Sequence, residues 1–266
     1  MKILPLIILL VLLVPKIQAF EEGEGNVDIA IELLSSIPGR DLQWDWWQAR
    51  TAFVPSSKDG KGTKSKWVTT MSETGRAVSH DFHDIFESVS YDQGATWSKP
   101  KRLDSLRRFK QDDGYEVSAG DLWPTYHKKS GKVISTGKTF NFEKGTNENI
   151  RREKVSYAVM DPKSGKWGKL RFLEMPEKDY AGNIITAANA GNTQRVDLPN
   201  GNILLPVRYM ADSKKVNYTS IVALCRFDGE KLVYVKHGTE HSIPRDRGLY
   251  EPSLIEHKGE YFLTLR

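Results

Sequence analysis

The sequence predicts an all-β fold of the β-propeller type, built from repeated sheet modules. One observation is a hairpin pattern that occurs three times, in which alternating apolar and polar residues flank a turn glycine. The other is a cation that follows each turn glycine after seven residues, so each module delivers a charge to the same structural place. The stretches are Trp123–Lys138, Thr193–Arg208 and Glu251–Arg266, with glycines Gly131, Gly201 and Gly259 and cations Lys138, Arg208 and Arg266.

Composition narrows the class of protein. The chain of 266 residues has a formal net charge of +5, which favours anionic partners. Its lysines are scattered, without the long basic runs of a nucleic-acid-binding arm, so we expect no nucleic-acid partner. The single cysteine, Cys225, excludes an intrachain disulfide framework and a cysteine-rich metal site, and we expect it to be buried in a strand. No cofactor is expected, and the oligomeric state stays open.

Residues 1–19 predict export. Lys2 supplies a positive start, Ile3–Val14 is apolar apart from Pro5, and Ala19 offers a small residue at a cleavage site. Because the apolar run is short for a transmembrane helix, no stable membrane insertion is expected. We expect a signal peptide and a secreted or periplasmic protein, with a membrane tether as the alternative if the segment is not cleaved.

A lead-in segment, residues 20–44, precedes a single β domain at residues 45–266. The lead-in carries a helix-like pattern at Val27–Ile37. No linker rich in Pro, Gly or Ser divides the domain. A propeller blade has four strands and the ring must close, so the strands correspond to about three and a half blades and we expect a truncated chain.

The first blade is expected to contain strands at Trp44–Pro55, Trp67–Met71 and Asp84–Tyr91. The second is predicted from Asp121 to Trp167, the third from Thr193 to Lys236, and the fourth from Glu251 onwards.

The most specific motif is the octapeptide Ser90–Trp97, SYDQGATW. Asp92 can accept hydrogen bonds from the N–H groups of the turn, and Gly94 can take a backbone angle that other residues resist. Trp97 is expected to start the next strand. We therefore expect Ser90, Asp92, Gly94, Thr96 and Trp97 to form a structural turn, remote from the chemistry.

The octapeptide matches Ser-x-Asp-x-Gly-x-Thr-Trp, the Asp-box of sialidase-like β-propellers, at every defining position. A degenerate copy at Asp161–Trp167 keeps the Asp, the Gly and the Trp. The chain therefore resembles the sialidase-like, Asp-box-repeat family over about residues 45–266. The resemblance implies a six-bladed propeller and an exo-glycosidase that removes terminal anionic sugars, such as sialic acid, from glycans.

The resemblance also implies roles for individual residues. Glu251 and Arg266 stand where the family has an active-site glutamate and an arginine that binds the substrate carboxylate. The family's first arginine falls at Arg50, and its acid/base aspartate at Asp81 or Asp84. Its nucleophilic tyrosine and a third arginine are expected in later blades that this chain does not include, so the resemblance implies a fragment that is inactive alone.

These residue types suit an acidic sugar. Guanidinium groups bind a carboxylate through two parallel hydrogen bonds, an aspartic acid can protonate the leaving oxygen, and sialidases use a tyrosine nucleophile. Arg208 joins the set through the glycine-to-cation register. The segment after Arg50 lacks the Ile-Pro of the family, and Arg208 is an additional arginine, so the identity of the sugar stays open.

Three functions remain open at this point. The first is a secreted exo-glycosidase of the sialidase type, and the second is an enzyme of the same fold that cleaves another acidic polysaccharide, as a hydrolase or a lyase. The third is a non-catalytic carbohydrate-binding propeller.

A metal site is not expected at His80, Asp81, His83 and Asp84, because these residues lack a helical ligand spacing.

Overall fold

The computed structural model describes residues 17–19, 27–29, 36–39, 41–57, 64–76, 80–143, 145–146, 149–212 and 215–266. These residues form β-strands and one short 3-10 helix, so the all-β prediction is confirmed. Over the same ranges, no helix has the length and apolar character needed to cross a membrane.

The chain divides into two compact units, Met1–Ser36 and Ile37–Arg266. In the first unit, β1 (Ile17–Ala19) pairs antiparallel with β2 (Val27–Ile29). The predicted helix-like segment is therefore wrong at its start, which is a strand, and its residues 30–35 lie outside the described residues. Residues 1–16 of the predicted signal peptide and most of the lead-in also lie outside them.

The second unit contains the remaining strands and the 3-10 helix η1 (Asp104–Leu106). The first sheet consists of β3 (Trp44–Val54), β4 (Lys66–Gly75), β5 (Phe82–Ser90) and β6 (Lys101–Arg102). The second consists of β7 (Phe109–Lys110), β8 (Glu116–His127), β9 (Lys132–Phe142), β10 (Asn149–Ile150), β11 (Val155–Asp161), β12 (Lys166–Trp167) and β13 (Arg171–Phe172). The third consists of β14 (Thr186–Asn189), β15 (Val196–Asp197), β16 (Asn202–Met210), β17 (Tyr218–Phe227) and β18 (Leu232–His237), and β19 (Ser253–His257) and β20 (Glu260–Thr264) form a C-terminal hairpin.

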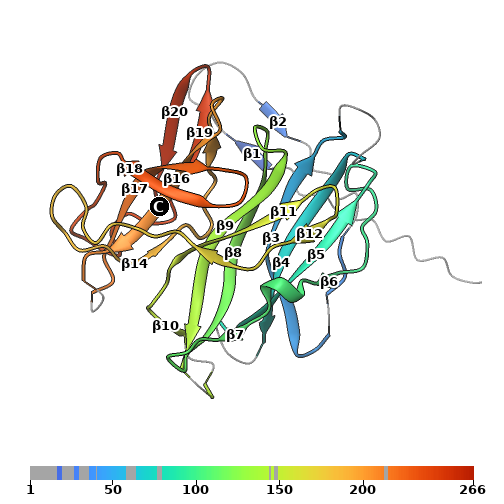
Figure 1. Cartoon of the computed structure of the whole chain (residues 1–266), viewed down its shortest axis with the longest axis horizontal. Coiled ribbons are helices and arrows are strands. Elements are labelled where there is room, and N and C mark those ends of the chain that lie inside the picture. Colours follow the sequence, from blue (N-terminus) through green and yellow to red (C-terminus); the bar gives the residue numbers. More distant parts are fainter. Residues whose placement is uncertain are drawn as a thin grey trace, which may run out of the picture. The chain divides into compact units, whose positions relative to one another are not determined.

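Each sheet is antiparallel and built mainly from strands that follow one another in the chain. The strand orders are β3-β4-β5-β6, β12-β11-β9-β8-β7 and β14-β16-β17-β18, with β10, β13 and β15 attached to β9, β11 and β16. In Figure 1 the sheets follow the chain from blue through green and yellow to red. Neighbouring sheets contact each other through their first long strands. In the first and second sheets these are β3 and β8, and the third sheet packs its strands β15 and β16 against β19 of the C-terminal hairpin.

The repeated hairpin turns are confirmed. Gly131 connects β8 to β9, Gly201 precedes β16, and Gly259 connects β19 to β20. Their φ angles are 68°, 85° and 84°, in the left-handed region that favours glycine. The common sequence pattern therefore corresponds to a common turn geometry, and the cations that follow start from equivalent places.

The octapeptide forms a closed loop after β5. The Asp92 carboxylate accepts hydrogen bonds from the Thr96 backbone N–H (2.9 Å), the Thr96 hydroxyl (2.6 Å) and the Ser90 hydroxyl (2.8 Å). Gly94 has a φ of 92° and donates its N–H to the Ser90 hydroxyl oxygen (2.8 Å). These bonds satisfy the polar groups of the turn internally, as expected of a structural loop.

One detail of this loop was predicted wrongly. Trp97 does not start the next strand, since β6 begins at Lys101. Ser98 still donates its N–H to Val89 of β5 (2.9 Å), but Pro100 has no N–H to continue the ladder. Regular pairing therefore resumes only after the proline.

Asp92 gives the first testable prediction. Hydrogen bonds from Thr96 lower the pKa of Asp92 to about 2. A carboxyl whose pKa is lower in the folded state stabilises the fold above its unfolded value, near 3.9, and this contribution is lost as the pH falls toward 2. Asp92→Ala should therefore lower the Tm at neutral pH, and the difference from the wild type should shrink between about pH 4 and pH 2.

Thermal unfolding followed by circular dichroism at several pH values measures this difference. Lys99→Ala, an exposed substitution shortly after the same loop, serves as the control and should leave the Tm unchanged. A difference in Tm that is the same at pH 2 and pH 7 would contradict the role assigned to the Asp92 carboxylate.

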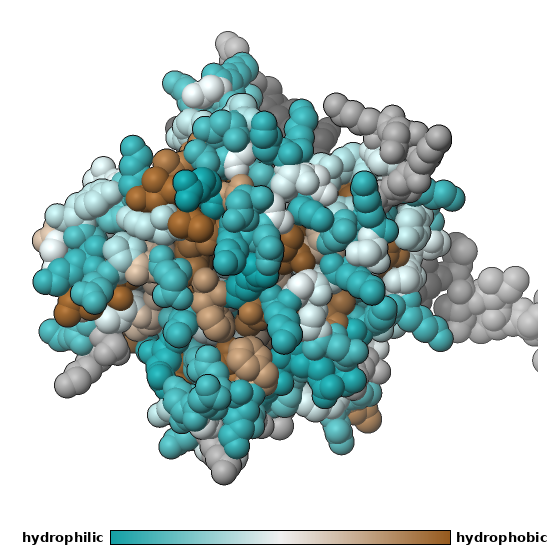
Figure 2. All heavy atoms as spheres, in the orientation of Figure 1, coloured by the Kyte–Doolittle hydropathy of each residue, from teal (hydrophilic) through white to brown (hydrophobic). Residues whose placement is uncertain are grey.

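Apolar side chains pack in three clusters. One lies within the third sheet and against β11, and includes Leu205 and Cys225; a second lies between the first and second sheets. The third consists of Phe82, Phe140 and Phe142. Burial raises the pKa of Cys225 to about 12, so the prediction of a buried thiol is confirmed. Figure 2 shows that hydrophilic residues cover most of the face in view, with apolar residues in separate groups.

Candidate functional site

A cavity of about 760 Å³ receives side chains from all three sheets of the second unit and from its C-terminal hairpin. The described residues that line it include five cations: Lys138, Arg151, Arg208, Arg247 and Arg266. They also include three carboxylates: Asp121, Glu153 and Glu251. A concave site with both acids and a surplus of cations suits an anionic ligand and acid–base chemistry.

Two polar side chains reach this cavity from the same kind of backbone irregularity. In β3 and in β8 the register with the following strand shifts by one residue, which is a β-bulge. The residues at the two bulges, Gln48 and Asp121, both have a φ of 54°. A bulge redirects a side chain, and non-glycine residues in the left-handed region concentrate at functional sites because the surrounding fold must hold them there.

Glu251 occupies the equivalent place in the C-terminal hairpin. It has a φ of 50° and follows Tyr250, whose backbone pairs with Arg266 through two hydrogen bonds of 3.2 and 2.9 Å. Asp121 likewise follows Gly120, the register partner of Lys138. In both modules an acid at an irregular position therefore stands next to the cation that comes seven residues after the turn glycine.

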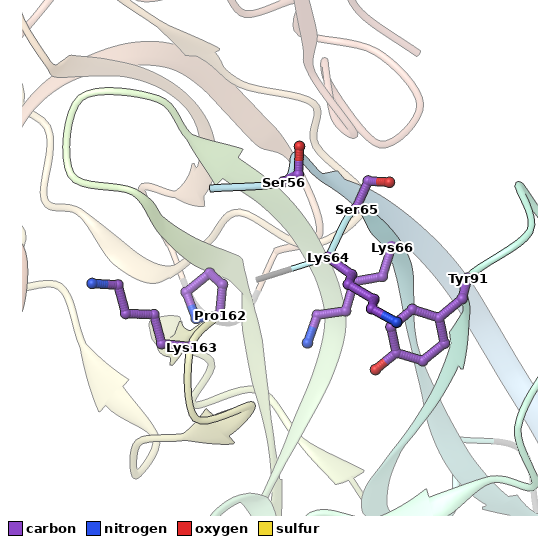
Figure 3. A pocket seen from close by; sticks show the side chains of 7 residues that line it. All are labelled: Ser56, Lys64, Ser65, Lys66, Tyr91, Pro162 and Lys163. Carbon is purple, nitrogen blue, oxygen red and sulfur yellow. The ribbon is translucent and has the colours of Figure 1, made fainter. Parts of the chain in front are cut away.

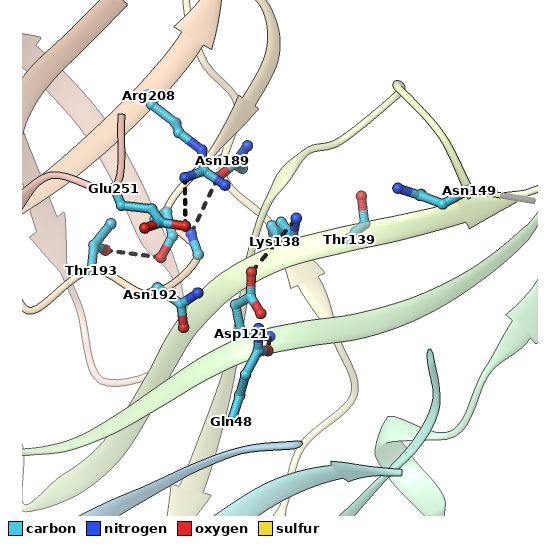
Figure 4. A network of polar contacts seen from close by, with 12 residues as sticks. Gln48, Asp121, Lys138, Thr139, Asn149, Asn189, Asn192, Thr193, Arg208 and Glu251 are labelled. Carbon is cyan, nitrogen blue, oxygen red and sulfur yellow. Dashed lines mark hydrogen bonds and ion pairs between the residues drawn. The ribbon is translucent and has the colours of Figure 1, made fainter. Parts of the chain in front are cut away.

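Each of these acids is paired with its cation. The Lys138 ammonium lies 3.6 Å from Asp121 Oδ2. The Arg266 Nη1 lies 2.7 Å from Glu251 Oε2, and the Arg208 Nη1 lies 3.7 Å from Glu251 Oε1. Figure 4 shows Asp121 facing Lys138, and Glu251 facing Arg208, within one polar network.

The surroundings of the two acids differ. Asp121 is buried, with 3% of its surface exposed, whereas 28% of the Glu251 side chain is exposed. Burial raises the pKa of Asp121, and the positive charges of Lys138 and Arg208 oppose this rise. Two carboxyl groups at equivalent positions but in unlike environments are suited to different roles.

An arginine and tyrosine wall closes one side of the cavity. The guanidinium groups of Arg208 and Arg247 lie over both Tyr218 and Tyr250, at 4.7 to 5.9 Å from the ring centroids. Arg266 lies over Tyr250 at 5.1 Å. Stacking on aromatic faces holds guanidinium groups in place while leaving their N–H donors available to a ligand.

Several buried polar atoms around the cavity have no hydrogen-bond partner among the described residues. They are Nε and Nη1 of Arg208, Oδ1 of Asp121, Oε2 of Glu153 and Nδ2 of Asn189. Leaving such groups unsatisfied costs free energy, so this concentration is typical of a site that a ligand completes.

The structure brings together Glu251, Arg208 and Arg266, three of the residues singled out from the sequence. Arg50 lies close by without lining the cavity. Its guanidinium donates to the side-chain oxygen of Asn192 (3.2 Å), which does line it, and rests over Trp123 at 4.9 Å.

Asp81 and Asp84 do not line the cavity, in contrast to what the family resemblance implies. Asp81 is buried and pairs with His83 (2.8 Å) and Arg108 (3.7 Å). Asp84 pairs with Arg102 and Arg107, both at 3.8 Å. Both carboxylates pair with cations of their own sheet and of the segment after it, as Asp121 and Glu251 do with theirs, but they do so outside the cavity. Within the described ranges, no group of three or more His, Cys, Asp or Glu side chains is arranged to hold a metal ion.

Sequence reasoning did not include Asp121, Lys138 or Arg247 among the site residues. Lys138 already belonged to the glycine-to-cation register, which is the signal that could have added it. Asp121 lies before the repeated stretch Trp123–Lys138, whereas Glu251 begins the stretch Glu251–Arg266, so the register did not mark Asp121 as the counterpart of Glu251. For Arg247 and the tyrosines of the wall, the sequence carried no comparable signal.

A second cavity, of about 790 Å³, lies at the start of β4. Its described lining residues are Ser56, Lys64, Ser65, Lys66, Tyr91, Pro162 and Lys163 (Figure 3). They include lysines but no carboxylate, so this cavity lacks the paired acids and cations of the first one. We therefore assign the candidate chemistry to the cavity around Asp121 and Glu251.

Comparisons with known proteins support the fold. No protein-family model and no curated protein sequence matches the chain. Among solved structures, a Trypanosoma rangeli sialidase aligns with 83% of this chain and 34% of its own, at 14% identity and a TM-score of 0.56. The Hadza microbial sialidase Hz136 aligns with 85% of this chain and 42% of its own, at 13% identity and a TM-score of 0.55.

A protein of unknown function from Dyadobacter fermentans aligns with 86% of this chain and 64% of its own, at 14% identity and a TM-score of 0.59. The chain thus spans less than two thirds of the length of each of these structures. At these identities the comparison establishes a likeness of fold: this all-β chain folds like part of a sialidase.

Proposed function

We propose that this protein is a glycoside hydrolase that removes a terminal anionic sugar from a glycan, in the manner of an exo-sialidase. One observation carries the proposal: two carboxyl groups at equivalent positions, Asp121 and Glu251, stand among five cations in one cavity. Sialidases differ from most glycoside hydrolases in using a tyrosine in place of the carboxylate nucleophile, so the two carboxyl groups here are given acid–base and electrostatic roles, and the cations provide the binding energy for an acidic sugar.

The arginines of the cavity contribute in different ways to binding the acidic sugar. Arg208 has buried N–H groups without a hydrogen-bond partner among the described residues, so it is the best-placed donor to a carboxylate of the sugar. Arg266 and Arg247 belong to the arginine and tyrosine wall and extend its positive charge toward solvent. Glu251, held between Arg208 and Arg266, lies where a negative charge can stabilise the positive charge that develops on the sugar ring during bond cleavage.

We further propose that the protein is exported, on the basis of residues 1–19. N-terminal sequencing of the mature protein from its natural host tests this independently of any activity. A sequence that begins after Ala19 supports export with cleavage, and one that retains the apolar run supports a tether.

The function is tested with a panel of glycans that end in acidic or neutral sugars, with sialosides first. We expect release of a terminal acidic sugar. Arg266→Ala should raise the KM for that substrate roughly tenfold, because it removes a charge-assisted hydrogen bond to a carboxylate. Its effect on a matched neutral glycoside should be small.

Arg171→Ala is the matched control, because Arg171 forms a surface pair with Glu230 outside the cavity. Binding of acidic glycans without turnover would favour a carbohydrate-binding protein. An unsaturated sugar product would favour a lyase, and equal activity on neutral glycosides would contradict the role given to the cations.

A further inference from the structure

The Asp121 carboxyl group has an enclosure of its own at the edge of the cavity. Its backbone N–H donates to the side-chain oxygen of Gln48 (3.0 Å), the residue at the equivalent bulge of the first sheet. Two glycines leave space for this residue, Gly191 for its carboxyl group and Gly137 for its backbone. A Cβ atom at Gly191 would lie 2.7 Å from Asp121 Oδ2, and one at Gly137 would lie 3.0 Å from the Asp121 carbonyl oxygen.

This enclosure holds Asp121 in one orientation. Oδ2 faces Lys138 at 3.6 Å, while Oδ1 is buried and has no hydrogen-bond partner among the described residues. The charges of Arg208 and Glu251 also act on the carboxyl group, so it belongs to the cluster that is proposed to hold the sugar. An unsatisfied carboxyl oxygen in such a cluster is available to a ligand atom.

We propose that Asp121 is the proton donor of the reaction and that Lys138 is its positioning residue. This inference rests on the proposed function and replaces Asp81 or Asp84 in that role. The Asp121 carboxyl gives its proton to the glycosidic oxygen, and the bond between this oxygen and the anomeric carbon breaks with its electron pair moving to the oxygen. The leaving group departs as an alcohol; water then adds to the anomeric carbon and returns one proton to the Asp121 carboxylate.

The environment of Asp121 agrees with this role. Burial raises the pKa of the Asp121 carboxyl, which keeps it protonated to higher pH than an exposed aspartate. Lys138 limits the rise, so the acid remains strong enough to give up its proton. Glu251, at the equivalent place in the C-terminal hairpin, is instead paired with two arginines and serves as the negative charge.

Asp121→Asn tests the role through its dependence on the leaving group. On a natural glycan, whose leaving sugar needs a proton, kcat should fall about 10²- to 10⁴-fold. On an aryl glycoside with an acidic phenol as leaving group, which departs without protonation, the loss should be much smaller. Asp113→Asn, an exposed aspartate that pairs with Arg152 at the surface, is the control and should behave like the wild type on both substrates.

Two further variants separate chemistry from structure. Gly191→Ala keeps the carboxyl but displaces it, and should reproduce the leaving-group dependence of Asp121→Asn. Lys138→Met removes a charge that opposes protonation, so the alkaline limb of the pH–rate profile should move to higher pH. Equal losses on both leaving groups, or an unshifted pH profile in Lys138→Met, would overturn the assignment.

A pH titration of the Asp121 carboxyl group without substrate tests its role as proton donor even if no glycan in the panel is cleaved. In ¹³C NMR spectra of the labelled protein, a carboxyl signal absent from Asp121→Asn should titrate above the ordinary range of aspartate. Titration at or below that range overturns the proposal. Failure of the proposed function has a different signature, namely wild-type protein that neither binds nor cleaves acidic sugars.

Discussion

Replacing Arg208 by alanine should raise the KM for a carboxylate-bearing glycan roughly 10- to 150-fold, the value of one to two charge-assisted hydrogen bonds in a buried setting. The effect should exceed that of Arg266→Ala. Only 7% of the Arg208 side chain is exposed, against 66% for Arg266, so water and salt screen its charge far less. Steady-state kinetics on the acidic substrate found in the glycan panel measure both variants side by side.

Arg208→Lys separates charge from geometry. Lysine keeps the positive charge but lacks the planar fork that binds both oxygens of a carboxylate, so it should recover part of the lost affinity and not all of it. The Tm of each variant must be recorded, because Glu251 loses a partner when Arg208 is removed. A KM that is unchanged in folded Arg208→Ala would show that the acidic group of the substrate binds elsewhere.

The sequence predicted the parts of this site that depend on local chemistry. A turn glycine and the alternation around it fix the hairpin, and the register of the hairpin fixes where a residue seven positions later will lie. Arg208 and Arg266 were located in this way, and Lys138 follows the same rule. The three cations meet in one cavity because the modules are equivalent, which is a property of the repeat itself.

Asp121 could not be found by the same reasoning. Its position depends on a β-bulge, which the alternation of residues does not reveal, and on space left by Gly137 and Gly191 from other strands and loops.

The sequence analysis also missed the strand β14, whose position depends on its partner strand. Its sequence, TAAN, is short and rich in small residues, and its pairing with β16 supplies the order that its own composition does not.

Asp81 and Asp84 show how distant residues can change the surroundings of a candidate acid. A loop with two aspartates is a reasonable place for an acid when it is considered by itself. Arg108 and Arg107 follow more than twenty residues later, and the fold brings them back to pair with Asp81 and Asp84. Ion pairs between segments so far apart are set by tertiary structure, and no spacing rule in the sequence reports them.

Phe140→Ala should lower the free energy of unfolding by about 3–5 kcal/mol, because it empties a fully buried aromatic site. Phe140 stacks on Phe82 with ring centroids 4.0 Å apart, and 1% of its surface is exposed. For a domain of this size the loss corresponds to a Tm lower by roughly 6–20 °C. Phe53→Ala, at an aromatic residue that is 56% exposed, should change the unfolding free energy by less than about 0.5 kcal/mol.

The Phe140 ring also supports Asp121, the proposed acid, through its contact with Lys138. The Lys138 ammonium lies 4.2 Å from the Phe140 ring centroid, so the aromatic face helps to hold the cation beside Asp121. Phe140→Leu refills most of the volume but offers no aromatic face, and should restore much of the stability while Lys138 remains loosely held. Denaturant unfolding measures the first effect, and the pH–rate profile of folded Phe140→Leu measures the second. If Phe140→Leu is as stable as the wild type and its profile is unshifted, the ring acts in packing alone and Lys138 is positioned by Asp121 itself.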